Sequence, residues 1–285
     1  MTGQQAIDLI HERSWVGRKP GLERTQALLA RMGNPERTLK FVHITGTNGK
    51  GSTAAMTASM LSAAGYRTGL FTSPHLFRFH ERMQVNGEPI ADEALGRLTE
   101  RVLNLAEGME DFPTEFELMT AVGMAFFAEQ KCDIVVLEVG LGGRMDSTNV
   151  IPAPEVAVLT NIGLEHTQEL GNTVALITKE KSGILKPGCR CVLYHQSREA
   201  EEVVEGVCLE LDIPLTVTAP ETLKVQSIGL EGQVFSYRDA GPFRISLLGE
   251  YQRYNAITAL DIVWSLREKG WQISDEAIRR GLADS

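Results

Sequence analysis

The chain has 285 residues, 43% of them hydrophobic, and is long enough to bury the core of one large domain or two modest ones. Its formal net charge of −9 argues against a nucleic-acid partner, and no stretch reaches the roughly 18 consecutive apolar residues of a membrane span. The four cysteines form neither zinc-type pairs nor a disulfide framework. We therefore expect a cytoplasmic protein with no nucleic-acid or membrane partner.

Apolar runs that alternate with longer helical patterns predict a parallel sheet flanked by helices. The expected strands are Phe41–Thr45, Thr68–Thr72, Ile134–Val139, Val156–Ile162 and Cys191–Tyr194. The run Ile134–Leu137 is apolar at every position, as is typical of a central strand covered on both faces. The predicted fold class is α/β, with a mostly parallel sheet.

Residues 44–53 read ITGTNGKGST and follow the first expected strand. Their glycines allow backbone N–H groups to converge on an anion, and Lys50 adds a positive charge for phosphate groups. Ser52 or Thr53 can reach a Mg²⁺ ion. The stretch that follows predicts a helix whose N-terminus faces the phosphates, so we interpret the segment as a phosphate-binding loop.

The loop is a variant of the common pattern. Gly46 and Gly49 are closer together than the two glycines of G-x-x-x-x-G-K-[ST], and Gly51 separates Lys50 from Ser52. An ordinary glycine turn between a strand and a helix is the alternative interpretation. We favour nucleotide binding because a simple turn has no use for the lysine.

Polar residues follow several expected strands, at the edge where an open α/β sheet binds its ligands. Glu138 ends a buried strand, where an unpaired carboxylate is costly, so we expect it to bind a cation. His166 follows the next strand and could complete a Mg²⁺ site, or equally be a surface histidine. The segment Ser73-Pro74-His75 is either a second active-site loop or a plain turn.

Other segments have structural alternatives too. Thr114–Glu117 opens a helix, where its carboxylates could simply be favourable charge at the N-terminus, and Lys179–Gly183 would ordinarily be a solvated helix end. Beyond about residue 213, short alternating stretches predict a small antiparallel β appendage over about 213–250, and Asn255–Lys269 predicts a last helix that packs on the sheet. The appendage stretches are Pro214–Thr218, Gln233–Tyr237 and Phe243–Leu247.

Together these segments resemble the folylpolyglutamate synthase and dihydrofolate synthase family, ATP-dependent ligases related to the Mur peptidoglycan ligases. The resemblance spans nearly the whole chain and rests on motifs in the same order: Gly21–Arg24, HITGTNGKGST, FTSPHL, LEVGLGGRMDSTN, NIGLEHTQELGNT, KEKSGILK and Gln252–Ala256. It implies that residues 1–285 form a Mur ligase-like ATPase domain and that the family's C-terminal glutamate-binding domain is absent.

The resemblance also implies the reaction. The γ-phosphate of ATP would pass to a carboxylate of a folate or of dihydropteroate, and the amine of L-glutamate would then attack the acyl phosphate. ATP and Mg²⁺ are the implied cofactors. Because the family often works as a monomer, we expect a monomer here.

Individual residues match family positions with these roles. The ATP-binding positions are Thr47, Asn48, Gly49, Lys50, Gly51, Ser52 and Asn255, and the metal positions are Ser52, Ser73, Glu138 and His166. The folate or pteroate positions are Gly21, Thr114, Glu115, Phe116, Glu117, Met145, Asp146 and Ser147. The implied catalytic residues are Lys50, His166 and Lys181, and Lys181 matches the lysine that the family carbamylates.

Two features depart from the family pattern. This chain has Tyr251-Gln252 where many relatives have His-Gln, and its relatives continue beyond Ser285 with a second α/β domain. A module that binds MgATP without ligase activity is therefore the alternative function. A simple P-loop kinase is disfavoured by the variant loop.

Overall fold

The computed structural model describes residues 1–12 and 21–285. Its helices are α1 (Gly3–His11), α2 (Glu23–Arg31), α3 (Lys50–Ala63), α4 (Asp92–Ala106), α5 (Glu115–Glu129), α6 (Thr167–Leu170), α7 (Val174–Lys181), α8 (Arg198–Glu210), α9 (Glu250–Glu268) and α10 (Asp275–Ala283). Its strands are β1 (Phe41–Thr45), β2 (Thr68–Phe71), β3 (Met83–Val85), β4 (Glu88–Pro89), β5 (Ile134–Glu138), β6 (Val156–Leu159), β7 (Arg190–Leu193), β8 (Leu215–Val217), β9 (Lys224–Gly229), β10 (Gly232–Tyr237) and β11 (Ala240–Ile245).

Eight strands form one sheet in the order β4-β3-β2-β5-β1-β6-β7-β8, and β11-β10-β9 form a separate antiparallel sheet. Neighbouring strands in the series β2-β5-β1-β6-β7-β8 pair in parallel, whereas β3 and β4 add an antiparallel edge beside β2. This arrangement confirms the predicted α/β fold class. Each of the five strands predicted from apolar runs is present, most of them one to three residues shorter than expected.

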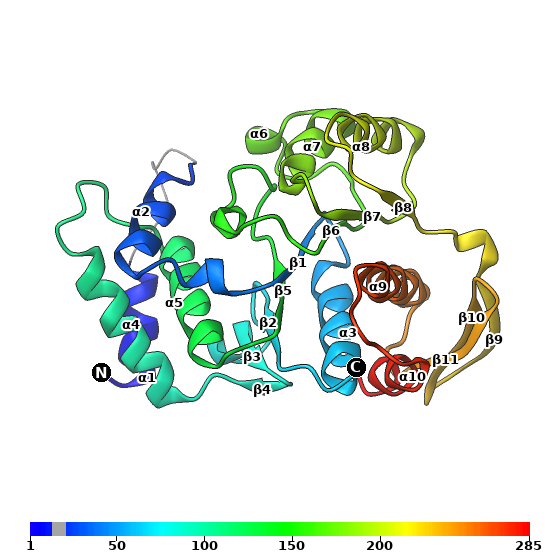
Figure 1. Ribbon diagram of the computed structural model, residues 1–285, viewed down its shortest axis with the longest axis horizontal. Helices are drawn as coiled ribbons and strands as arrows, with labels where there is room; N and C mark the ends of the chain where they lie inside the picture. Colours follow the sequence, from blue (N-terminus) through cyan, green and yellow to red (C-terminus); the bar gives the residue numbers. More distant parts are fainter. Residues whose placement is uncertain (13–20) are drawn as a thin grey trace.

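Helices cover the large sheet on both faces. Successive residues of β1 point to opposite faces of the sheet, so each face contributes side chains to a different core. Phe41 belongs to a core that includes side chains of α1, α2, α4 and α5. Val42 and Ile44 belong to a second core with α3, α9 and α10 (Figure 1). A third core, under α7 and α8, covers β6 and β7. The central strands are therefore buried on both faces, as their continuous apolar runs predict.

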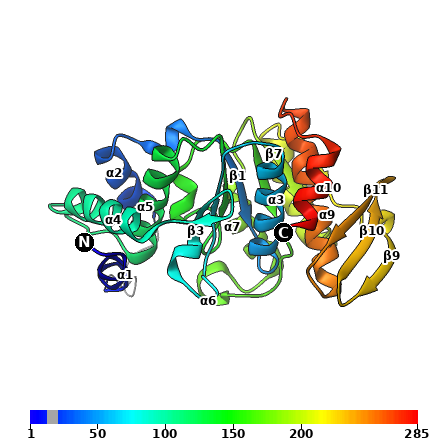
Figure 2. The ribbon, with the colours of Figure 1, turned by 90° about the horizontal axis from the view of Figure 1, so that it is seen from below.

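The small sheet lies beyond α9 and α10, at the far side from α1 (Figures 1 and 2). Tyr237 of β10 joins it to α9, since its hydroxyl donates to Oδ2 of Asp261 at 2.7 Å and its ring stacks on Trp264. One expectation for this region is wrong. Leu215–Val217, expected in the appendage, forms β8 and pairs in parallel with β7 of the large sheet.

The structure adds two observations that bear on the composition argument. Of the residues that it describes, none belongs to a helix long and apolar enough to cross a membrane. Cys132, Cys189, Cys191 and Cys208 are all buried free thiols.

Parallel pairing brings the carboxyl ends of six strands, β1, β2, β5, β6, β7 and β8, to a single edge of the sheet. The residues that follow β1, β2, β5, β6 and β7 there include Gly46, Ser73, Val139, Thr160 and Tyr194. Open α/β sheets bind their ligands at this edge. Most of the predicted site residues follow these strand ends.

Candidate functional site

The phosphate loop, residues 46–52, connects β1 to α3. Gly49 precedes the helix with φ 85°, a left-handed conformation that glycine adopts at little cost. The amides of Thr47 and Asn48 donate to the main-chain oxygen of Asn161, at 2.7 and 3.3 Å, and tie the loop to the end of β6. The amides of the first helical turn have no acceptor within the helix, so these are the groups that remain for an anion.

Two lysines bind the same loop oxygen. Nζ of Lys50 donates to the main-chain oxygen of Gly46 at 3.0 Å, and Nζ of Lys181 donates to it at 2.8 Å. Lys181 lies at the end of α7 with 1% of its surface exposed, and Oε1 of Glu165 accepts from its ammonium at 2.9 Å. Burial lowers the pKa of Lys181, although Glu165 opposes that change. The loop is thus bordered by two ammonium groups, one of them deeply buried.

Glu138 lies beside the phosphate loop. A Cβ added to Gly51 would come within 3.6 Å of Oε2 of Glu138, and the same oxygen accepts the amide of Ser73 at 3.1 Å. Burial raises the pKa of Glu138 to about 7, against the opposing effects of the Ser73 amide and Lys50. The neighbouring groups therefore compensate only part of the cost of burying this carboxylate.

A first pocket, of about 520 Å³, opens along the phosphate loop. It is lined by Asn48, Gly49, Ser52, Asn161, Tyr194, Tyr251 and Asn255. Oδ1 of Asn255 would lie 2.3 Å from a Cβ at position 49, so glycine is needed there to leave room for the amide. Nδ2 of Asn255 donates to Oε1 of Gln252 at 3.0 Å, which fixes its orientation. The pocket joins the loop to the first turns of α9.

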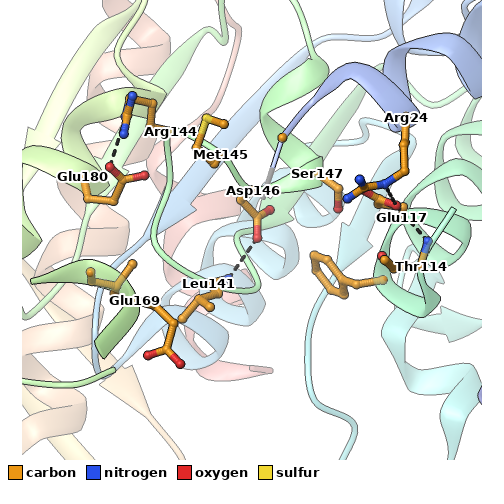
Figure 3. A pocket seen from close by; sticks show the side chains of 13 residues that line it. Arg24, Thr114, Glu117, Leu141, Arg144, Met145, Asp146, Ser147, Glu169 and Glu180 are labelled. Carbon is orange, nitrogen blue, oxygen red and sulfur yellow. Dashed lines mark hydrogen bonds and ion pairs between the residues drawn. The ribbon is translucent and has the colours of Figure 1, made fainter. Parts of the chain in front are cut away.

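A second pocket, of about 390 Å³, lies between α5, the segment that follows β5, and α6 with α7 (Figure 3). It is lined by Gly21, Arg24, Thr114, Phe116, Glu117, Leu141, Arg144, Met145, Asp146, Ser147, Glu169, Leu170 and Glu180. Seven of these residues were expected at a folate or pteroate site. The eighth, Glu115, is not among the lining residues and instead pairs with His11 at 2.8 Å.

The border of the second pocket at α5 is held by Glu117. Its Oε2 accepts the amide of Thr114 at 2.7 Å, which caps the helix, and its carboxylate accepts Nε of Arg24 at 3.0 and 3.1 Å (Figure 3). Arg24 also pairs with Asp111 at 2.9 Å. The carboxylate of Glu117 therefore does structural work at the helix N-terminus, the alternative left open by the sequence, while it also lines the pocket.

Asp146 links the two pockets electrostatically. It is buried, and its negative charge helps to raise the pKa of Glu138 and opposes the lowering of the pKa of Lys181. On the pocket wall its Oδ2 accepts the amide of Leu141 at 2.9 Å, shown in Figure 3. The charge of Asp146 in the second pocket therefore acts on Glu138 and Lys181 beside the phosphate loop.

Comparisons with known proteins agree with this arrangement. The Mur ligase middle domain family matches residues 44–263. The chain is 41% identical to the dihydrofolate synthase/folylpolyglutamate synthase of Bacillus subtilis (strain 168), over 98% of this chain and 67% of that protein. It is 35% identical to the folylpolyglutamate synthase of Lacticaseibacillus casei, over 100% of this chain and 69% of that protein. The chain belongs to the folylpolyglutamate and dihydrofolate synthase family. This confirms the resemblance.

Solved structures of this family superpose on nearly the whole chain. One described as an FPGS-AMPPCP-folate complex has a TM-score of 0.93 and 33% identity, and covers 100% of this chain and 72% of that chain. A folylpolyglutamate synthase from Thermotoga maritima has a TM-score of 0.87 and 36% identity, and covers 98% of this chain and 65% of that chain. The chain thus spans about two thirds of the length of these relatives.

His166 is one of the residues expected to bind the metal. It is exposed at the start of α6 with a left-handed φ of 44°, and its place in a metal site stays a prediction. The residue before it, Glu165, was missed by the sequence analysis although it pairs with Lys181. A carboxylate beside a candidate ligand histidine was the available signal. Tyr194 was noted only as a strand end, yet it lines the first pocket.

Proposed function

We propose that this chain adds L-glutamate to a folate or to dihydropteroate in an ATP-dependent ligation. Its relatives are named as folylpolyglutamate and dihydrofolate synthases, and a similar structure is described as a complex with AMPPCP and folate. The observation that carries the proposal is a second pocket whose buried Asp146 acts electrostatically on Glu138 and Lys181, the two buried groups beside the phosphate loop.

The roles of the individual residues follow from this placement. The phosphate loop and Lys50 would hold the triphosphate, and Asn255 would contact the adenine in the first pocket. Met145, Ser147 and Phe116 would contact the pteridine in the second pocket. The substrate carboxylate would then lie toward Glu138 and Lys181, where the phosphoryl group arrives.

The reaction balances without a further co-reactant. An oxygen of the substrate carboxylate attacks the γ-phosphorus of ATP, and ADP leaves. The amine of glutamate then attacks the acyl carbon, an amide forms, and inorganic phosphate leaves with release of a proton. Lys50 and the amides at the start of α3 would stabilise charge on the transferring phosphoryl group, mainly by positioning it.

The residues around Glu138 fit a divalent cation. Glu138 is a buried oxygen ligand whose pKa is raised to about 7, and Ser52 and Ser73 offer further oxygens near the loop. Mg²⁺ in this place would supply charge neutralisation for the phosphates. Glu138, Ser52 and Ser73 are the proposed ligands, with His166 as a fourth candidate.

The experiment that tests the proposal is mass-spectrometric detection of glutamate added to dihydropteroate or tetrahydrofolate by the purified chain with ATP, Mg²⁺ and bicarbonate. A product larger by one glutamate residue would support the ligase and identify the acceptor. If MgATP binds but no product forms with either acceptor, the chain by itself is the MgATP-binding module considered above.

A further inference from the structure

A buried histidine on β1 has no place in the proposed reaction. His43 is fully buried, three residues before the phosphate loop, and its Nε2 lies 2.9 Å from Oγ1 of Thr148. Oγ1 of Thr148 in turn lies 2.5 Å from Oδ1 of Asp146. The three side chains form a continuous buried line from the central strand to the wall of the second pocket.

The positions of the protons in this line follow from its chemistry. Asp146 also accepts the amides of Thr148 and Leu141, at 3.0 and 2.9 Å, so its carboxylate acts as an acceptor on both oxygens. The single proton of the Thr148 hydroxyl therefore goes to Asp146, and the hydroxyl oxygen must accept from Nε2–H of His43. Nδ1 of His43, which has no partner among the described residues, then carries only a lone pair.

This line of hydrogen bonds holds the pocket wall, which we define as residues 140–148. Leu141, Met145 and Ser147 of the wall face the second pocket, whereas the oxygens of Asp146 are turned to donors within the wall itself. A second residue of β1 grips the same segment, since Oγ1 of Thr45 donates to the main-chain oxygen of Gly142 at 2.5 Å. The strand that leads into the phosphate loop thus also fixes the wall.

We propose that His43 and Thr148 are positioning residues for the pteridine: the relay from Nε2–H of His43 through the Thr148 hydroxyl to Asp146 holds the pocket wall in its binding shape. This inference rests on the proposed function, because it names the second pocket as the pteridine site. Neither His43 nor Thr148 is among the residues that line the second pocket. Their loss should weaken binding in the second pocket while leaving the first pocket intact.

Binding measurements with matched variants test the relay. Thr148→Val keeps the shape and removes the hydroxyl, His43→Leu removes the donor, and His43→Gln places an amide N–H near the position of Nε2. We expect the first two to weaken dihydropteroate binding about tenfold, equivalent to about 1.4 kcal/mol, with MgATP affinity unchanged, and His43→Gln to restore most of it. Thr68→Val is the control, because it removes another buried strand hydroxyl, at the start of β2.

A double variant separates a relay from two independent contacts. If the relay is one unit, His43→Leu with Thr148→Val should bind dihydropteroate no more weakly than Thr148→Val alone. Full additivity, unchanged binding in Thr148→Val, or equal losses for MgATP and dihydropteroate would each overturn the proposal. A fall in melting temperature without a change in either affinity would show a merely structural role and overturn it too.

A measurement without substrate keeps this inference distinct from the proposed function. In ¹⁵N-histidine-labelled protein, His43 should be neutral with its proton on Nε2, and Thr148→Val should change its ¹⁵N shifts. A proton on Nδ1 would overturn the relay whatever the protein binds. If the tautomer is as expected but the wild-type chain binds MgATP and no pteridine, the relay stands as a device of the fold, while the pteridine role and the proposed function both fail.

Discussion

Lys181 and Gly46 are joined by a hydrogen bond of 2.8 Å that crosses from the end of α7 to the phosphate loop. The bond matters because the lysine is almost fully buried and its pKa is lowered, chiefly by burial. A buried amine of lowered pKa is more often neutral, and the neutral amine is the form that adds to CO₂. The same placement that ties Lys181 to the loop therefore favours the carbamylation that the family resemblance implies.

We expect a carbamate on Lys181, formed when the neutral amine adds to CO₂ and releases a proton. With ¹³C-bicarbonate, ¹³C NMR of the wild-type chain should show a carbamate signal that is absent from Lys181→Arg. Lys186→Arg is the matched control, because burial lowers the pKa of Lys186 to about 8 without placing it on the loop. A signal that survives Lys181→Arg, or disappears in Lys186→Arg, would assign the carbamate elsewhere.

Lys50→Ala should weaken MgATP binding roughly ten- to hundredfold, the range expected for losing hydrogen bonds from a charged donor. Its ammonium rests on the oxygens of Gly46 and Thr47 rather than in the core, so the variant should remain folded. Isothermal titration with a non-hydrolysable ATP analogue would measure the loss. Lys40→Ala, at the other end of the same strand, should bind as the wild type does. If Lys50→Ala bound MgATP with wild-type affinity, residues 46–52 would not be the phosphate-binding loop.

The sequence predicts the central fold well because the decisive signals are local. The continuous apolar runs of β1 and β5 and the glycines before α3 each specify a strand or a turn within a few residues. The short strand β8 was assigned to the wrong sheet for the same reason, because its local signal is weak. β8 has three residues, and nothing within such a short run distinguishes parallel pairing with β7 from an antiparallel hairpin.

The candidate site is predictable only where a residue type is unusual for its position. Glu138 stands out at the end of an apolar strand, whereas the sequence marks Glu165 by no more than its position beside His166, because its partner Lys181 lies 16 residues away. The family resemblance assigned Asp146 to the folate or pteroate site, and Asp146 lines the second pocket, but only the structure shows that its oxygens accept the amides of Leu141 and Thr148. His43 looks like an ordinary strand residue in the sequence.

Glu138→Ala should weaken Mg²⁺-dependent nucleotide binding more than binding measured in EDTA, because the carboxylate is proposed to contact the cation. Glu138→Gln is the matched variant, since it keeps the acceptor for the Ser73 amide and removes the charge. It should also raise the melting temperature, because a partly compensated buried carboxylate costs stability. Equal losses with and without Mg²⁺ would show that Glu138 serves the fold and not the metal.

The stability of the protein should fall in acid partly because of His43. Burial, aided by Lys186, lowers the pKa of His43 from 6.5 to about 3. Below pH 6.5 the imidazole of His43 is protonated in the unfolded chain but stays neutral in the folded protein. The contribution of His43 to the unfolding free energy is therefore fully present above that pH and is lost progressively down to about pH 3.

Between about pH 7.5 and about pH 5 this single group should therefore cost about 2 kcal/mol of unfolding free energy. Urea unfolding at the two pH values would measure it. His43→Gln has no titratable group at this position, so its unfolding free energy should fall by about 2 kcal/mol less on acidification than that of the wild type. Thr148→Val retains His43, so its unfolding free energy should depend on pH as that of the wild type does. An unchanged pH dependence in His43→Gln would mean that the imidazole is protonated as easily in the folded protein as in the unfolded chain, which its burial between β5 and β6 argues against.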